Sequence, residues 1–285
     1  MAVDARVLPE AAFAPAGQGR RSLWGDALDE LRRLTRYRFL ARYLFSTSLR
    51  SEHVGTVFGY FWWILDPLLT GLTYLILVDV MLGRGGVNYP VFVFTSVVVW
   101  KSFLGGVRNA MGQTAGKVGL MKQIAFPRAI VPLVAVAAEL ARFLFGLIAL
   151  LAFASALGHF PGTALLYLPL VVLAQIPLML GLAFVLSGLG VLFRDVDNLS
   201  QFVFRAWFFL SPALYPLSSA PTGTARQFFD INPLATLLPA YHSIFVDGGM
   251  PDLAALAYVA LGCLPVLVGG YLAFVRLESA FAKVR

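Results

Sequence analysis

Charged residues and cysteine are scarce in this sequence. Only 13% of its 285 residues are Asp, Glu, Lys or Arg, whereas an ordinary soluble domain has roughly 25%. The single cysteine, Cys263, excludes a disulfide framework and a cysteine-rich metal site. Hydrophobic residues make up 59% of the chain, and the mean hydropathy is +0.79. This composition predicts an integral membrane protein rather than a soluble one.

A phosphate-binding loop is absent as well. Such a loop reads G-x-x-x-x-G-K followed by Ser or Thr, and the nearest approach, at residues 116–118, continues with Val118 instead. We therefore expect no nucleotide cofactor on this chain, so any energy that its function needs must come from a separate subunit or a gradient. The three histidines are scattered, without the spacing of metal ligands. Neither a metal site nor a catalytic residue is predicted.

Long apolar runs are abundant. A helix that crosses a bilayer needs about 20 mostly apolar residues, and six runs reach this length. They predict an all-α integral membrane protein with six transmembrane helices, at residues 57–81, 91–114, 130–157, 164–193, 199–217 and 253–275. The second run is the weakest of the six, because it contains Lys101, Arg108 and several glycines.

Charged residues also occur within other predicted spans, among them Asp66, Glu139, Arg142 and Arg205. Charge is costly in lipid, so these side chains should face the protein interior or a wet path. Glu139 and Arg142 are three residues apart and can pair across one helical turn. Such a pair is compatible with a structural or a functional role.

The distribution of Lys and Arg predicts the orientation in the membrane. If the first span starts in the cytosol, nine of these residues precede it on the cytosolic side. Three more lie at 115–128, one is Arg194, and three lie from Arg276 onward, whereas only Arg84 and Arg226 lie outside. Cytosolic loops of membrane proteins are rich in Lys and Arg, so both termini are expected in the cytosol. This asymmetry, rather than binding to nucleic acid, explains the net charge of +7.

The first 55 residues lack the apolar core of a secretory signal and are expected to stay in the cytosol. Within them, Trp24, Leu28, Leu31 and Leu34 recur at helical spacing. An amphipathic helix on the inner membrane face is predicted, and a soluble helix docked on a partner is the alternative. The predicted domains are a flexible cytosolic tail (1–21), a cytosolic amphipathic interface segment (22–55), a six-span transmembrane domain (56–276) and a cytosolic C-terminal tail (277–285).

The predicted external segment, residues 218–252, contains an apolar piece at 233–246. This piece is too short to cross a bilayer. It predicts a pair of short re-entrant or interfacial helices before the last span, because a loop in water would not need so many apolar residues. A simple external loop helix is the alternative.

Three separated motifs carry a family resemblance. Residues 194–216 read RDVDNLSQFVFRAWFFLSPALYP, a polar turn and an aromatic span that ends in prolines. Residues 55–69 read GTVFGYFWWILDPLL, and residues 119–133 read GLMKQIAFPRAIVPL. Together they resemble the permease subunit of type-2 ABC exporters, in the branch that exports polysaccharide and teichoic acid. The resemblance covers about residues 22–276.

This resemblance implies a function and partners. The chain would form a homodimer, bind two copies of a separate ABC ATPase that holds ATP and Mg²⁺, and export a lipid-linked polysaccharide across the bacterial inner membrane. The polymer would be of the O-antigen, galactan or teichoic acid type. A permease for a drug or small lipid is one alternative, which would need a narrow apolar cavity. A membrane-embedded glycan-processing enzyme is another, which would need a clustered acidic or histidine site.

The loop at 115–128 is the predicted coupling surface. It mixes apolar and basic residues, and Pro127 would stop a short helix begun near Gly119, which leaves an apolar face for a groove on another protein. The resemblance assigns that groove to the ATPase, and contact with anionic lipid headgroups is the alternative. The candidate coupling residues are Gly119, Leu120, Met121, Lys122, Ile124, Phe126, Pro127 and Arg128.

Aromatic residues gather in the first and fifth predicted spans. Aromatic rings stack on the apolar faces of sugars, although those at helix ends are commonly interface anchors. The resemblance implies that these two spans line a conduit between two copies of the chain. The candidate conduit residues are Tyr60, Trp62, Trp63, Phe202, Trp207, Phe208, Phe209 and Tyr215. The candidate cytosolic turn is Arg194 and Asp195, and the candidate external gate is Asn232, Pro233 and Tyr241.

Overall fold

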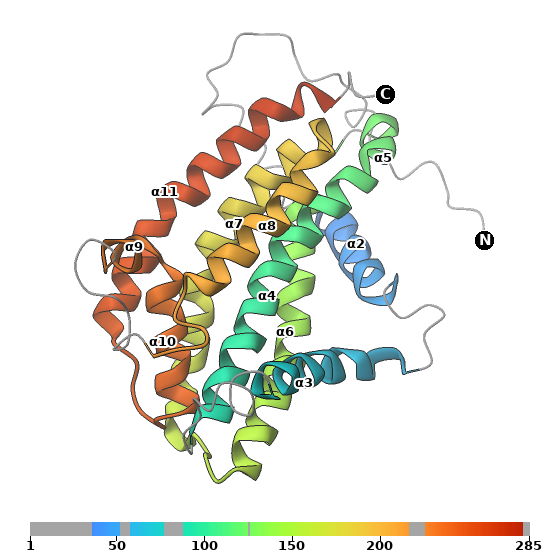
Figure 1. Ribbon diagram of the computed structural model, residues 1–285. Helices are drawn as coiled ribbons and strands as arrows, with labels where there is room; N and C mark the ends of the chain where they lie inside the picture. Colours follow the sequence, from blue (N-terminus) through green and yellow to red (C-terminus); the bar gives the residue numbers. More distant parts are fainter. Residues whose placement is uncertain (1–35, 52–57, 77–87, 125, 217–225, 282–285) are drawn as a thin grey trace.

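The computed structural model describes residues 36–51, 58–76, 88–124, 126–216 and 226–281, and every regular element in these ranges is a helix (Figure 1). Four helical stretches are long and apolar enough to cross a membrane. They are α4 (Tyr89–Gly116), α6 (Ile130–Ala156), η5 (Gly162–Tyr167) continued by α7 (Leu168–Leu192), and α11 (Leu253–Glu278). The chain is therefore a multi-pass membrane protein. These helices match the second, third, fourth and sixth predicted spans.

The first predicted span is represented by η3 (Gly59–Phe61) and α3 (Trp62–Leu75). Figure 1 shows α3 lying across α4 and α6 rather than along them. The last part of this predicted span, beyond residue 76, lies outside the described residues. A crossing by the first span stays a prediction.

The fifth predicted span is represented by α8 (Asp195–Phe209), which has 15 residues. It begins earlier than predicted, because the polar stretch expected as a turn forms its first helical turn, with Asp195 and Asp197 there. Carboxylates at this end are favoured by the helix dipole. The helix ends before Ser211 and Pro212, as the proline pattern predicted. At 15 residues α8 is shorter than a typical span, so its crossing also stays a prediction.

Helix α4 forms the centre of the bundle, between α6 and α7. In its most apolar window 72% of the residues are buried, against 22% for α11. Phe94 and Phe103 of α4 are among the largest fully buried side chains. The exposed residues of α11 are mostly apolar, for example Tyr258 and Leu261, so this helix has the surface expected of one that faces lipid.

The helices α7 and α11 touch through their backbones. A Cβ at Gly181 would lie 2.6 Å from the carbonyl oxygen of Val266, and a Cβ at Gly270 would collide with the carbonyl of Gly181. Small residues allow this close approach between helices in membranes. The contact holds α11 on the bundle although most of its surface is exposed.

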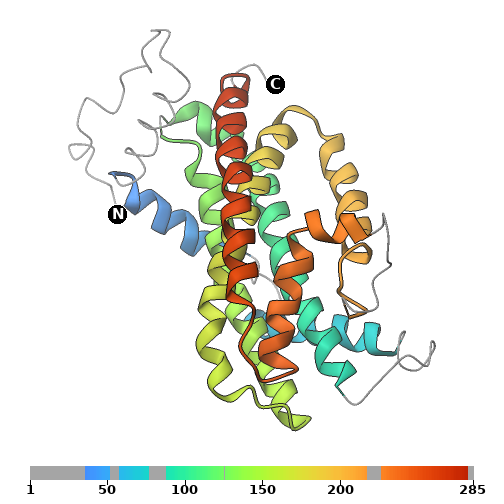
Figure 2. The ribbon, with the colours of Figure 1, turned by 90° about the vertical axis from the view of Figure 1, so that its left-hand side faces the viewer.

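Two short helices precede α11, as predicted: α9 (Arg226–Ile231) and α10 (Leu234–Phe245). Figure 2 shows α10 beside α11, near the end of the bundle opposite α5 (Val118–Gln123). The apolar side chains of α10 are buried, and two buried hydrogen bonds tie it to its neighbours. His242 Nε2 and Ser96 Oγ of α4 are 2.8 Å apart, and Tyr241 Oη donates to Gln175 Oε1 of α7 at 3.0 Å. The apolar piece at 233–246 is thus packed within the bundle.

The N-terminal region contributes α2 (Arg38–Ser51), which packs against α6. Leu44 is its buried anchor, and Gln113 Nε2 of α4 donates to Ser48 Oγ at 2.7 Å. Phe39 and Tyr43 remain exposed on its outer face. The predicted amphipathic stretch from Trp24 to Leu34 lies outside the described residues.

The close contact between α7 and α11 can be tested with two neighbouring glycines. Gly270→Ala should force the helices apart and lower the free energy of unfolding by about 1 to 3 kcal/mol. It should therefore lower the thermal unfolding temperature of the purified protein in detergent. Gly269→Ala is the control, because a Cβ there meets no neighbouring helix within 4 Å; it should leave the temperature unchanged or raise it. Equal effects of both substitutions would argue against the contact.

Candidate functional site

Polar residues form a stripe along α4. Lys101, Gly105, Arg108, Gly112 and their polar neighbours recur three or four residues apart, and this spacing places them on one face of the helix. The stripe is completed by Asn109 and Gln113. Lys101, Arg108 and two of the glycines that weakened the prediction of this span therefore lie along a single side of it.

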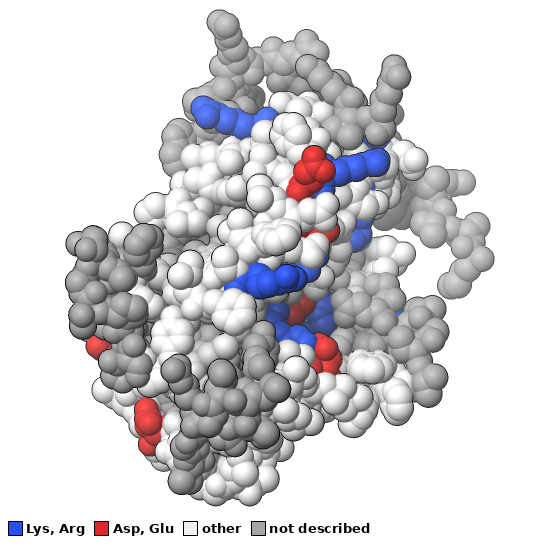
Figure 3. Space-filling view, in the orientation of Figure 1, with Lys and Arg blue, Asp and Glu red and all other residues white. Residues whose placement is uncertain are grey.

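The stripe is the floor of an open groove, which we call the α4 groove. Three adjoining cavities of about 580, 510 and 290 Å³ lie along it, and Asn109 lines all three. The largest is bounded by the junction of α7 and α8, the second by α3 and α6, and the third by α2. Figure 3 shows blue and red side chains gathered in a band through the middle of this face.

Two ion pairs connect α4 to the short helices beside the groove. The ammonium of Lys101 contacts the carboxylate of Asp66 in α3 and donates to Thr70 Oγ1 at 2.9 Å. Arg108 Nη2 lies 3.1 Å from Asp197 Oδ1 in α8. These pairs are partly exposed, so in water each would contribute little. Away from water the attraction is far stronger, and each pair lets a charged α4 residue remain within a membrane.

A buried polar cluster lies deeper, between α4 and α6. Glu139 Oε2 accepts from Arg142 Nε at 2.9 Å and from Asn109 Nδ2 at 3.0 Å. The side chains of Glu139 and Arg142 are only 12% and 7% exposed, so the pairing predicted from their spacing is confirmed. Gly105 makes room for the carboxylate, because a Cβ there would lie 2.6 Å from Glu139 Oε1. Removing either charge of such a buried pair is strongly destabilising, because the other charge is left uncompensated.

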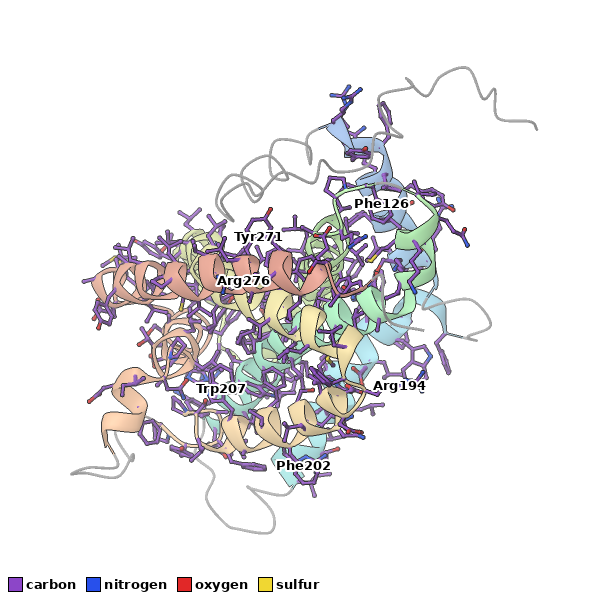
Figure 4. The ribbon with its side chains drawn as sticks, turned by 90° about the horizontal axis from the view of Figure 1, so that it is seen from above. Phe126, Arg194, Phe202, Trp207, Tyr271 and Arg276 are labelled. Carbon is purple, nitrogen blue, oxygen red and sulfur yellow. The ribbon has the colours of Figure 1, made fainter. Side chains whose placement is uncertain are left out.

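The predicted conduit aromatics divide into exposed and packed residues. Tyr60, Trp62, Phe202 and Phe209 are exposed on α3, its preceding turn and α8. The other four pack on the chain itself. Trp63 is half-buried and its ring packs at a tilt against that of Phe145, and the remaining three are Trp207, Phe208 and Tyr215. Figure 4 shows Phe202 on the outer side of α8 and Trp207 on its inner side.

The inner side of α8 is part of the core. Phe208 is 4% exposed and its ring centroid lies 5.3 Å from that of Trp100 in α4. Trp207 packs edge-on against Trp100 and Phe103. These two residues hold α8 against α4, whereas the exposed rings of Phe202 and Phe209 remain available to a ligand or a second protein.

The candidate gate residues connect α10 to α8. Asn232 Oδ1 accepts from Trp207 Nε1 at 2.9 Å, and Asn232 Nδ2 donates to Ser211 Oγ at 2.9 Å. Pro233 is the N-cap of α10, and Tyr241 is fully buried within it. Trp207 packs on Trp100, which is eleven residues into α4, or about 17 Å along the helix. The turn between α9 and α10 therefore reaches the middle of the bundle.

The candidate coupling loop contains the short helix α5, which begins at Val118, close to the predicted start at Gly119. The helix ends at Gln123, because the backbone of Ile124 is extended. Ile124 is 53% exposed, and Gly119 and Lys122 are exposed beside it. The expected exposure of Met121 and Phe126 is corrected by the structure, which buries both. They pack in a cluster with Ala129, Phe274 and Phe281, because α11 ends close to this loop.

The remainder of the loop is fixed to the chain. Pro127 is buried, and Leu120 is half-buried. Arg128 Nη1 donates to the backbone oxygen of Glu278 at 2.7 Å and lies 3.4 Å from its carboxylate. Lys117, which separates α4 from α5, donates to Gln113 Oε1 at 2.9 Å, and burial lowers the pKa of its ammonium. The surface left for a partner is consequently smaller than predicted.

The predicted turn residues Arg194 and Asp195 are exposed at the start of α8. Arg194 also lines the largest cavity of the α4 groove. Figure 4 shows it at the end of the bundle. Among the described residues, no group of three or more His, Cys, Asp or Glu could hold a metal ion.

Sequence reasoning did not identify the groove itself. It noted the charges within the spans but gave no role to Lys101, Arg108 or Asn109. The available signal was the spacing of these residues on one face of α4. The predicted wet path for Asp66, Glu139 and Arg142 agrees with their position in the second cavity.

Comparisons with known proteins identify relatives over most of the chain. A sequence model of the family described as ABC-2 type transporter matches residues 33–246. An O-antigen export system permease protein RfbA of Myxococcus xanthus is 31% identical over 254 residues, which cover 89% of this chain and 98% of that protein. Two proteins of the same name from Klebsiella pneumoniae are 25% and 23% identical, each over 83% of this chain and 91% of the relative.

Proposed function

Because this chain belongs to the ABC-2 type transporter family, we propose that it is the membrane permease of an ATP-driven exporter of a lipid-linked polysaccharide. The three relatives described above are each named as an O-antigen export permease, which favours an O-antigen among the possible polymers. The membrane would be the bacterial inner membrane. ATP and Mg²⁺ would bind a separate ABC ATPase, because the sequence has no phosphate-binding loop.

The α4 groove is the observation that carries this proposal. It is open along the helix, it mixes charged and amide side chains, and the partly exposed ring of Trp62 in α3 lines it. A polymer that slides needs many weak contacts, and stacking on rings supplies contacts that tolerate different sugars. A drug or small-lipid permease would instead need an enclosed apolar cavity, whereas these cavities are open and have charged side chains in their lining.

The same groove supports a homodimer. Its charged residues cannot face lipid, and Arg205 is exposed beside Phe202 on the outer side of α8. A second copy placed against this face would shield the charges and close the groove into a conduit. The first and fifth spans would then line the conduit, as the resemblance implies.

The six-span topology belongs to this proposal. The end of the bundle that carries α5 and Arg194 would be cytosolic, together with both termini. The turn between α6 and α7 would lie outside, and α9 and α10 would re-enter the membrane from that side. The contact of Asn232 with Trp207 supports re-entry, because it lies at the middle of the bundle.

Single cysteines in a Cys263→Ala background test this topology in intact cells. Cysteines at Gly85 and Gly223 should react with a membrane-impermeant thiol reagent from outside, whereas cysteines at Gly119 and Val196 should react only after the membrane is opened. Labelling is measured on the purified protein by mass shift. Reaction of the Val196 cysteine from outside would overturn the six-span arrangement.

The function is tested by deleting the gene in its source organism. Loss of the surface polysaccharide, with lipid-linked glycan accumulating inside, is expected, and the wild-type chain should restore export. A Phe202→Ala/Phe209→Ala variant should restore less than about a fifth of the export rate at normal protein abundance, if each lost stacking contact is worth about 1 to 3 kcal/mol. An unchanged surface polysaccharide in the deletion strain would refute the proposed function.

We place the ATPase on the α5 surface, with one ATPase on each copy of the permease. Ile124 and Lys122 are exposed there, and the buried side chains of Met121 and Phe126 fix the helix to the bundle. A surface fixed in this way can transmit a conformational change of a bound partner to the bundle. Headgroup contact is the alternative, because Lys122 could meet anionic lipid.

Ile124→Asp should release the ATPase, because a charge would replace the apolar residue most exposed on this surface. Copurification of the ATPase and export should both be lost, while the permease remains inserted and dimeric. Leu166→Asp is the control, since Leu166 is an equally apolar, 81% exposed residue at the other end of the bundle. Continued copurification with the Ile124 variant would favour the headgroup contact.

A further inference from the structure

The second cavity of the α4 groove has the chemistry of a binding site. It has a volume of about 510 Å³, between α3, α4 and α6, which lies within the range of small-ligand sites, roughly 300 to 1,000 Å³. Its lining is aromatic in part, with Trp62, Trp63 and Phe143. The polar part of the lining includes Lys101, Ser102, Asn109, Glu139 and Arg142.

The aromatic part of the lining is partly preorganised. Trp63 lies between two other rings, with its centroid 5.0 Å from that of Tyr60 and 4.9 Å from that of Phe145. Trp62 is 39% exposed and so keeps part of its ring open. An indole face is apolar and electron-rich, and the C–H face of a pyranose ring is a suitable partner for it.

The charges of the cavity are balanced. Lys101 and Arg142 are opposed by Asp66 and Glu139, and each cation contacts a carboxylate. An anionic or cationic ligand would therefore meet as many repulsive as attractive groups. A neutral ligand with many hydroxyls fits better, because each hydroxyl can donate to a carboxylate and accept from an ammonium or an amide.

Ser102 gives an independent indication of a ligand. The other buried hydroxyls of α4, on Thr95, Ser96 and Thr114, each donate to the backbone carbonyl four residues earlier, at 2.7 to 3.1 Å. Ser102 Oγ is buried on the cavity wall, and among the described residues it has no hydrogen-bond partner. A buried polar group without a partner costs about 1 to 3 kcal/mol, so a ligand in the cavity that reached this hydroxyl would be stabilised by satisfying it.

We propose that this cavity is a subsite for one neutral sugar ring of the exported glycan. The ring would stack on Trp62, and its hydroxyls would bind Ser102, Lys101 and Asn109. This inference rests on the proposed function, and it adds a defined position to a path that otherwise offers only sliding contacts. A polymer that pauses there would be held by one sugar unit while the partner ATPase completes its cycle.

The test is substrate protection of a cysteine at the cavity wall. Ser102→Cys is made in the Cys263→Ala background and expressed with a partner ATPase that cannot hydrolyse ATP, so that glycan stays in the permease. Labelling by a small, membrane-permeant thiol reagent is followed in cells that make the strain's own glycan and in cells that do not. We expect labelling to be about fivefold slower or more when glycan is made.

Ser187→Cys is the matched control. Ser187 is another buried hydroxyl without a partner in the described part of the chain, but it lies on α7 and not on this cavity. Its labelling should not depend on glycan. Equal labelling of Ser102→Cys in both strains would mean that the cavity holds water only, and complete failure to label would mean that it is closed; either result overturns the subsite.

A second variant covers the case in which the cysteine disturbs folding. Trp62→Leu keeps apolar bulk but removes the ring, and it should lower the export rate about fivefold or more at normal abundance and normal ATPase copurification. Phe160→Leu, at an exposed ring in the turn after α6, should not. Normal export by Trp62→Leu would also overturn the subsite. Absence of export by the wild-type chain would instead refute the proposed function, so the two failures are distinguishable.

Discussion

Charged side chains on α4 must be kept away from lipid, and much of the structure is arranged around this requirement. Helix α3 brings Asp66 to Lys101, α8 brings Asp197 to Arg108, and α6 brings Glu139 to Asn109. In a medium of low dielectric an uncompensated charge would be very costly, whereas a paired one is tolerated. The short helices α3 and α8 therefore border the groove and are fixed to α4 by charge as well as by apolar packing.

The same requirement separates two kinds of surface. Helix α11 exposes mainly apolar residues and has the surface of a lipid-facing helix, whereas the α4 groove exposes charges, amides and aromatic rings. A second copy of the chain over the groove would remove this polar surface from lipid. The proposed conduit is thus a consequence of covering the charged side chains, and its aromatic edges provide the contacts that a glycan can use.

The two ends of the bundle are connected to the groove by different means. At one end Lys117 is both the C-cap of α4 and the N-cap of α5. The groove and the proposed ATPase surface therefore belong to one continuous stretch of chain. At the other end, buried hydrogen bonds join α10 to α4 and α7, and Asn232 joins it to α8. Buried polar groups that are satisfied in this way fix the short helices firmly in place.

The sequence by itself determined the membrane class, four of the six predicted spans, the short helices before α11, the Glu139 to Arg142 pair and the family, because these depend on local hydropathy, spacing and motif order. Only the tertiary structure decided which side chains remain available. It buried Met121, Phe126 and Phe208 and left Ile124 and Phe202 exposed. It also joined Lys101, Asn109 and Glu139 into one groove. Exposure and assembly depend on how distant helices pack against one another, and a periodic pattern within one helix does not contain that information.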